Sequence, residues 1–223
     1  IGMPISGICT GQVYLGGDGQ LWWWNLDGSK DATTEVNVEG LRFMNPSIAG
    51  SPRIQGFALA VGGGEFSLDA KGFKDVIFTN QYPMATVDYV DAACPVAVQL
   101  QAYTPFIPLN RDDSSYPVVV MRYTVKNTSA TAQDVAIAGW VQNISKSDDH
   151  TPLKYLASYS ELEGMTAIEC SADSKRAPDA GSIALGLFGG ERPEIKDIAR
   201  KQAGAAGIFT DGDLKHGAVY ELA

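Results

Sequence analysis

The sequence predicts an all-β protein, an antiparallel β-sandwich with long loops and at most one or two short helices. Short β-branched and aromatic runs alternate with clusters of Gly, Pro, Asn and Asp. Helical periodicity is scarce, and strands do not alternate with helices as they do in parallel α/β folds. With 45% hydrophobic and 19% charged residues, we expect residues 1–223 to form a single sandwich domain with a sizeable core.

The first predicted element is a hairpin over residues 11–28, "GQVYLGGDGQLWWWNLDG". Its glycine-rich turn, Gly16 to Gly19, supplies the positive φ angles that a tight reversal requires. Longer strands follow in "PVAVQLQAY", residues 95–103, and in "YPVVVMRYTVKN", residues 116–127. These runs are rich in β-branched residues and are bounded by turn-forming residues, which is typical of strands.

The strand over residues 116–127 is expected to be half-solvated, because its apolar residues share one face and its polar residues share the other. The apolar face holds Val119, Met121, Tyr123 and Val125, and the polar face holds Arg122, Thr124 and Lys126. After it, "NTSATAQ" is expected to turn the chain into "DVAIAGWVQN", residues 134–143, to form a second hairpin.

The best helical pattern lies in "ERPEIKDIARKQA", residues 191–203. There Ile195, Ile198 and Ala199 fall on one side, and Pro193 suits a first helical turn. Just before this segment, "GSIALGLF", residues 181–188, resembles a strand.

Composition excludes several classes of function. The net charge of -9 argues against nucleic acid or an anionic membrane surface, because both favour clustered Lys and Arg. No apolar run approaches the roughly 20 residues of a membrane-spanning helix, and the first residues lack the basic start and apolar core of a signal peptide. We expect a neutral ligand, and both ends of the chain look like cuts through a longer polypeptide.

We expect no cofactor and no metal. Cys9, Cys94 and Cys170 are odd in number and far apart, so they are interpreted as buried thiols and not as disulfides or CxxC ligands. The adjacent trio Asp148, Asp149 and His150 is interpreted as a solvated loop, since neighbours on an extended chain point in alternate directions. The glycine-rich stretches lack nucleotide-binding spacing.

Two segments are candidates for a functional surface. Trp22, Trp23 and Trp24 alternate in direction if they form a strand, so they favour packing in the core or at a domain interface over a single sugar-stacking platform. In "YTPFIPLNRDDSSYPVVV", residues 103–120, Pro105 and Pro108 fix an extended entry and turn-forming residues follow, so the segment is interpreted as an inter-strand connection. Arg111, Asp112 and Asp113 could be catalytic groups, but we expect Asp112 and Asp113 to be loop-capping or domain-contact groups and not a general acid and base.

Three stretches, "IGMPISGICTGQVYLGGDGQLWWWNL", "YPMATVDYVDAACPVAVQLQAYTPFIPLNRDDSSYPVVVMRYTVKNTS" and "VAIAGWVQN", resemble the amino-terminal domain of glycoside hydrolase family 116, the family of non-lysosomal glucosylceramidase and related β-glucosidases. The most specific piece is "AYTPFIPLNRDDSSYPV". The resemblance implies a two-domain enzyme in which a β-sandwich precedes a helical (α/α)6 barrel. That barrel carries the catalytic glutamate and aspartate of a retaining β-glycosidase.

No catalytic residue of that family maps onto this chain, so we expect the chain alone to be inactive. The resemblance implies a non-catalytic domain that packs against the barrel of the same polypeptide, which acts on a β-glucoside or glycolipid. Arg111, Asp112, Asp113 and Trp23 are then expected at the domain interface or at the rim of the active site. The alternative is an independent carbohydrate-binding module.

Overall fold

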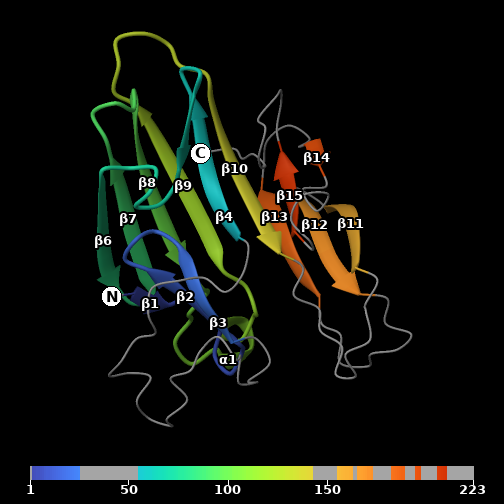
Figure 1. Ribbon diagram of the computed structural model, residues 1–223. Helices are drawn as coiled ribbons and strands as arrows, with labels where there is room; N and C mark the ends of the chain where they lie inside the picture. The colour runs from blue at the N-terminus through green and yellow to red at the C-terminus, as the bar shows by residue number, and fades with distance from the viewer. Residues whose placement is uncertain are drawn as a thin grey trace. The chain divides into compact units, whose positions relative to one another are not determined.

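A computed structural model describes residues 2–25, 55–142, 155–162, 165–172, 182–188, 194–196 and 205–209. Antiparallel strands dominate these residues, and the described part of the chain holds a single four-residue helix (Figure 1). The predicted all-β class is therefore confirmed. By the density of contacts the chain divides into two compact units: the described residues 2–25 and 67–133 form the first, and 55–66 with 134–209 form the second.

The first unit contains a small antiparallel sheet of β1 (Gly2–Pro4), β2 (Gln12–Gly16) and β3 (Leu21–Asn25), in that order. The predicted hairpin is confirmed, with Val13 opposite Trp24 and a shift of register before Leu15. Its turn is closed by the Gly19 amide, which donates to the Gly16 carbonyl at 3.0 Å. Gly19 has a φ of +84°, the conformation for which a glycine was expected there.

The second sheet of this unit is a four-stranded meander (Figure 1). It consists of β6 (Asp75–Gln81), β7 (Met84–Val90), β8 (Val96–Tyr103) and β9 (Val120–Asn127). Both long predicted strands are present. Along β8, buried and half-buried residues alternate. On β9, Tyr123 is buried while Arg122 and Lys126 are exposed, as the amphipathic pattern predicted.

The register of the meander defines two opposite ends. At one end Tyr103 lies opposite both Met84 and Val120, and at the other end Val96 lies opposite Asn127. The first end carries the β6–β7 turn and the long connection from β8 to β9. Together with the β1–β2 loop, which is hydrogen-bonded to that connection, these segments are called the loop end below: residues 4–10, 82–84 and 104–119.

A buried polar junction ties the turn of the β2–β3 hairpin to the segment that precedes β6. The Asp69 carboxylate accepts hydrogen bonds from Gln20 Nε2 at 2.7 Å and from the backbone amides of Lys71 and Gly72. Tyr89, fully buried on β7, approaches the Gly19 carbonyl with its hydroxyl at 3.5 Å. Because a buried carboxylate is costly unless it is hydrogen-bonded, these donors stabilise the junction.

The second unit is centred on β10 (Val135–Gln142), which pairs with β4 (Gln55–Val61) on one side and β15 (Ala205–Phe209) on the other. The sheet is completed by β5 (Gly64–Ser67) and β14 (Glu194–Lys196). A three-stranded sheet contains β11 (Tyr155–Leu162), β12 (Met165–Ala172) and β13 (Ile183–Phe188). The strand expected in residues 181–188 is thus confirmed.

The predicted second hairpin is wrong. β9 pairs with β8, and β10 pairs with β4 and β15, so β9 and β10 belong to different sheets. The turn residues are held locally instead: Asn127 Nδ2 donates to the Thr131 carbonyl, and the Thr128 amide donates to the Pro95 carbonyl. Both edges of β10 are already occupied by other strands.

The helix predicted over residues 191–203 is also wrong where the structure describes it. Glu194–Lys196 form β14, with Ile195 opposite Ile208 of β15. The backbone hydrogen bonds and the β-branched pair favour a strand over the weak helical period. The other residues of that predicted helix lie outside the described residues.

The expectation of buried thiols is only partly correct. Cys94 is buried, but Cys9 is exposed in the β1–β2 loop, where its φ is +60°. The side chain of Cys170 lies outside the described residues.

Among the residues described, no helix has the length and apolar character needed to cross a membrane.

Candidate functional site at the loop end

The connection from β8 to β9 contains a capped helical turn, α1 (Arg111–Ser114). Asn110 is its N-cap: the Asn110 Oδ1 accepts from the Asp113 amide at 3.1 Å, and the Asn110 Nδ2 donates to the Asp113 carboxylate at 2.6 Å. The turn was predicted only as a connection, because four residues are too few to show a helical period. The signal that could have found it is an Asn followed by an acid three residues later, as in a capping box.

Ser114 fixes the fold of this connection from inside. Its side chain is almost fully buried, at 1% exposure. The Ser114 hydroxyl oxygen accepts from the Ile107 amide at 2.9 Å and lies 2.6 Å from the Asn110 carbonyl, to which it donates. Further along, the Thr104 hydroxyl donates to the Val118 carbonyl at 3.0 Å. These hydrogen bonds all join residues of the connection to one another and so fix its shape.

The β1–β2 loop is joined to the same connection. The Ile8 amide donates to the Ser114 carbonyl at 2.8 Å. Gly7 lies so close to the Tyr116 carbonyl oxygen that a Cβ at this position would overlap it. Glycine is therefore required here by close backbone approach. Two segments that are distant in sequence form one surface.

Two residues of this surface have an unusual backbone. Cys9 has a φ of +60° and Leu109 a φ of +67°, and these are the positive-φ residues other than glycine in the part of the chain that the structure describes. The left-handed region costs about 1 kcal/mol or more for such side chains. Strain of this kind concentrates at functional sites and persists where surrounding hydrogen bonds hold the backbone. At Leu109 the backbone is held by the hydrogen bond from the Asn110 amide to the Ile107 carbonyl.

Large apolar side chains are exposed across the loop end. Leu109 is completely exposed, and Tyr82 and Phe106 form an edge-to-face pair with ring centroids 5.7 Å apart. The whole set, called the loop-end apolar patch, is Ile8, Tyr82, Met84, Phe106, Ile107, Leu109, Tyr116 and Val118. Exposed apolar residues are normal when scattered, whereas a contiguous group marks an interaction surface.

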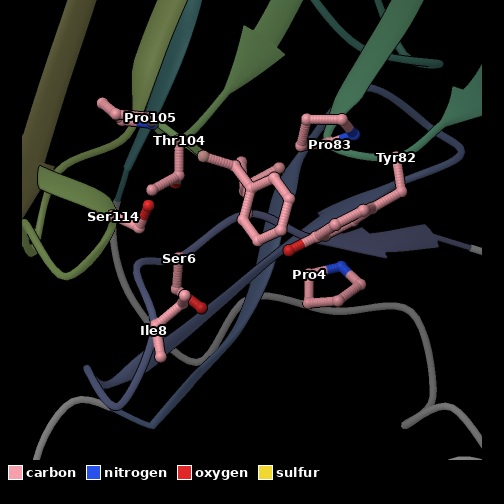
Figure 2. A pocket seen from close by; sticks show the side chains of 10 residues that line it. Pro4, Ser6, Ile8, Tyr82, Pro83, Thr104, Pro105 and Ser114 are labelled. Carbon is pink, nitrogen blue, oxygen red and sulfur yellow. The ribbon is translucent and has the colours of Figure 1, made fainter. Parts of the chain in front are cut away.

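A small hollow lies beside the aromatic pair (Figure 2). Its cavity volume is about 10 Å³, which is close to the space of one water molecule. Residues from the β1–β2 loop, the β6–β7 turn and the β8–β9 connection line it, Ser6, Tyr82 and Thr104 among them.

The three residues predicted in the connection do not form a catalytic pair. The Asp113 carboxylate accepts a hydrogen bond from the side chain of the N-cap residue Asn110 and so supports the cap of α1. Arg111 and Asp112 are almost fully exposed and pair with each other, Arg111 Nε to Asp112 Oδ1 at 3.1 Å. An exposed pair of this kind adds little stability. Within the described ranges, no group of three or more His, Cys, Asp or Glu side chains is placed to hold a metal ion.

The structure gives only the backbone of Trp23, in β3. The side chains of Trp22, Trp23 and Trp24 lie outside the described residues, so packing in the core or at an interface stays a prediction. The trio Asp148, Asp149 and His150 also lies outside them. The residues that form the apolar patch and the hollow could not be identified from the sequence, because both depend on non-local contacts.

Three groups in the described part of the chain have a raised pKa. Burial, with smaller contributions from Asp69 and Asp18, raises the pKa of Tyr89 far above its ordinary value. Burial is also the main cause that raises the pKa of the Cys94 thiol and of the half-buried Tyr14. None of the three is among the residues that line the hollow at the loop end, so these shifts reflect packing and not chemistry at that surface.

Comparison with curated proteins gave no significant match. A family model described as "beta-glucosidase 2, glycosyl-hydrolase family 116 N-term" matches residues 2–206, most of the chain. The chain therefore belongs to the family of N-terminal domains of glycosyl hydrolase family 116.

Proposed function

We propose that this chain is a non-catalytic domain that packs against the helical catalytic domain of the same polypeptide through its loop end. The family match supports the existence of a catalytic partner domain. The observation that carries the proposal is the loop-end apolar patch, which is held on a backbone cross-linked by hydrogen bonds. A rigid apolar surface loses little conformational entropy when it becomes an interface.

The composition of the patch resembles the centre of a domain interface. Tyr116 is an exposed aromatic residue of the patch beside the exposed Leu109, and aromatic residues are enriched at interface cores. Arg111 and Asp112 lie on α1 in the same connection, where their exposed charges suit a polar rim. We assign Arg111, Asp112 and Asp113 to this interface. Asp113 contributes indirectly, because its hydrogen bond from Asn110 supports the cap of α1. Trp23 is kept as a proposed interface residue.

The chemistry of the whole enzyme is assigned to the partner domain. A retaining β-glycosidase needs two carboxyl groups about 5 Å apart across the scissile bond. The Asp112 carboxylate forms an ion pair with Arg111, and the Asp113 carboxylate accepts a hydrogen bond from Asn110. We infer that the full polypeptide hydrolyses β-glucosides or glycolipids with that partner's carboxylates, while this domain supports the fold of the partner. The domain acts without a cofactor of its own, and residues 1–223 function as one domain.

The test uses the full-length enzyme with a charge placed in the patch. Leu109→Asp should lower the melting temperature of the catalytic domain and decrease kcat/KM, because a buried unpaired carboxylate opposes docking. Val90→Asp is the matched control: Val90 is also an exposed apolar residue, but it lies at the end of β7 opposite the loop end. If Val90→Asp and Leu109→Asp have equal effects, the loop end is not the docking surface.

A further inference from the structure

We propose that the hollow beside Tyr82 and Phe106 is a contact site for a pyranose ring, which rests on the aromatic side chains and inserts one hydroxyl or hydroxymethyl group. In taking a sugar as the ligand, this inference rests on the proposed function. It adds a site on this chain for which the comparisons assign no residue.

The aromatic pair gives the site an apolar surface. Tyr82 is 59% exposed and Phe106 is 41% exposed, so both rings are accessible to a ligand. Their edge-to-face arrangement holds each ring in place. In Figure 2 the Tyr82 ring lies next to Pro4 and Pro83, which restrict its movement further. The C–H face of a pyranose is apolar and stacks on such rings, as planar ligands do on aromatic side chains.

Two hydroxyl groups of the lining are available to a ligand. Within the described part of the chain, neither Ser6 Oγ nor Tyr82 Oη has a hydrogen-bond partner. Figure 2 shows the Tyr82 hydroxyl pointing inward, toward the other lining residues. The remaining hydroxyls of the lining, those of Thr104 and Ser114, are already bonded to backbone carbonyls. Ser6 Oγ and Tyr82 Oη can therefore donate hydrogen bonds to a sugar and accept them from it. The bonded Thr104 and Ser114 hydroxyls fix the wall of the hollow.

The size and charge of the site restrict the ligand. A volume of about 10 Å³ accepts one small polar group and excludes a whole ring. None of the described residues that line the hollow is charged, so none of them offers an opposite charge to a phosphate or a carboxylate. A neutral polyol with one apolar face fits the exposed rings, the small volume and the uncharged described lining. A β-glucopyranoside is a ligand of this class.

The rest of the loop end separates this site from the docking surface. Leu109 and Tyr116 are exposed on the β8–β9 connection and do not line the hollow, whereas Phe106 does. The proposal therefore assigns docking to Leu109 and Tyr116 and leaves the rings of Tyr82 and Phe106 to the sugar.

The experiment titrates the 223-residue chain with methyl β-D-glucopyranoside and follows binding by ligand-observed NMR. We expect saturable binding in the millimolar range, which corresponds to about -4 kcal/mol. Tyr82→Ala and Phe106→Leu should each weaken binding about fivefold or more, because each removes a stacking ring. Tyr82→Phe keeps the ring and should weaken binding about threefold through loss of one hydrogen bond.

Tyr116→Ala is the matched control, since it removes an exposed aromatic side chain of the loop end outside the hollow. It should leave the sugar affinity unchanged, and each variant is used only if its thermal melt matches that of the parent. Absence of saturable binding, equal binding of glycerol, or an equal loss in Tyr116→Ala would overturn the proposal. Docking is read separately from the comparison of Leu109→Asp with Val90→Asp, so either result stands without the other.

Discussion

The backbone amide of Ile8 donates a hydrogen bond to the carbonyl of Ser114 at 2.8 Å. Ile8 belongs to the β1–β2 loop, and Ser114 ends α1 in the connection between two strands of the meander. This bond joins the start of the chain to the segment that presents the loop-end apolar patch. The surface is therefore a property of two distant segments, and disturbing either one should alter both.

Ser114→Ala should destabilise the first unit by about 1 to 3 kcal/mol. The substitution removes the buried hydroxyl that accepts from the Ile107 amide and donates to the Asn110 carbonyl, and loss of hydrogen bonds at a buried position carries that cost. Ser115→Ala is the control, because the Ser115 hydroxyl is exposed and bonds only to the Asp112 carbonyl. Denaturant melts of both variants decide the matter, and similar midpoints for the two would show that Ser114 does not hold the connection.

Gly7→Ala should destabilise the protein by about 1 to 3 kcal/mol through overpacking. The added Cβ would overlap the Tyr116 carbonyl oxygen and approach the Ser115 carbonyl carbon, and backbone atoms cannot move aside as a flexible side chain can. Hydrogen exchange should also show faster exchange at the Ile8 amide. An unchanged melt together with an unchanged Ile8 amide would contradict the close approach of the two loops.

Leu100→Ala should cost about 2 to 5 kcal/mol, because it leaves a cavity under β8, where Leu100 is fully buried. Ile77→Ala, on the outer strand β6 of the same sheet, serves as the control, since about half of the Ile77 side chain is exposed. We expect the control to cost less than about 1 kcal/mol. Thermal unfolding of both variants gives the comparison, and a larger loss at Ile77 would reverse the assignment of the buried face.

Tyr89→Phe should make the protein less sensitive to alkaline pH. The folded state raises the pKa of Tyr89 above the value near 10 of an unfolded tyrosine. Below about pH 10 the Tyr89 phenol is therefore neutral in both the folded and the unfolded protein and does not oppose folding. As the pH rises past about 10, the unfolded state loses its proton first and stability falls.

The measurement is the free energy of unfolding of parent and Tyr89→Phe between about pH 8 and pH 11.5. Below pH 10 the two should agree within about 1 kcal/mol, because the bond to the Gly19 carbonyl is long at 3.5 Å. Above it the parent should lose stability faster. Tyr116→Phe controls for loss of an exposed phenol, and parallel curves for Tyr89→Phe and parent would refute the account.

The fold could be predicted from the sequence where the signal is local. The alternating residues of β8 and β9 and the glycine-rich turn before β3 determine these elements by themselves. The pairing of β10 could not be predicted, because its partners β4 and β15 are distant in sequence and a turn specifies a reversal without choosing the neighbour. The weak helical period around Ile195 lost to strand pairing for the same reason.

The site was predictable only in part. Pro105 and Pro108, with the turn-forming residues after them, indicate a connection, and Asp113 supports the cap of α1 through its hydrogen bond from Asn110. The positive φ of Leu109 leaves no trace in the sequence, since leucine rarely adopts it. The contact of Gly7 with the Tyr116 carbonyl likewise depends on tertiary structure.

The most direct test of the docking proposal is hydrogen exchange on the full-length glycoside hydrolase and on the 223-residue chain alone. The proposal expects slower exchange in the full-length protein for amides of residues 105–118, at the loop end. Amides of residues 128–133, which follow β9 at the opposite end of the meander, serve as the internal reference and should exchange equally in both. Equal exchange of residues 105–118 in the two proteins, or protection confined to residues 128–133, would contradict docking through the loop end.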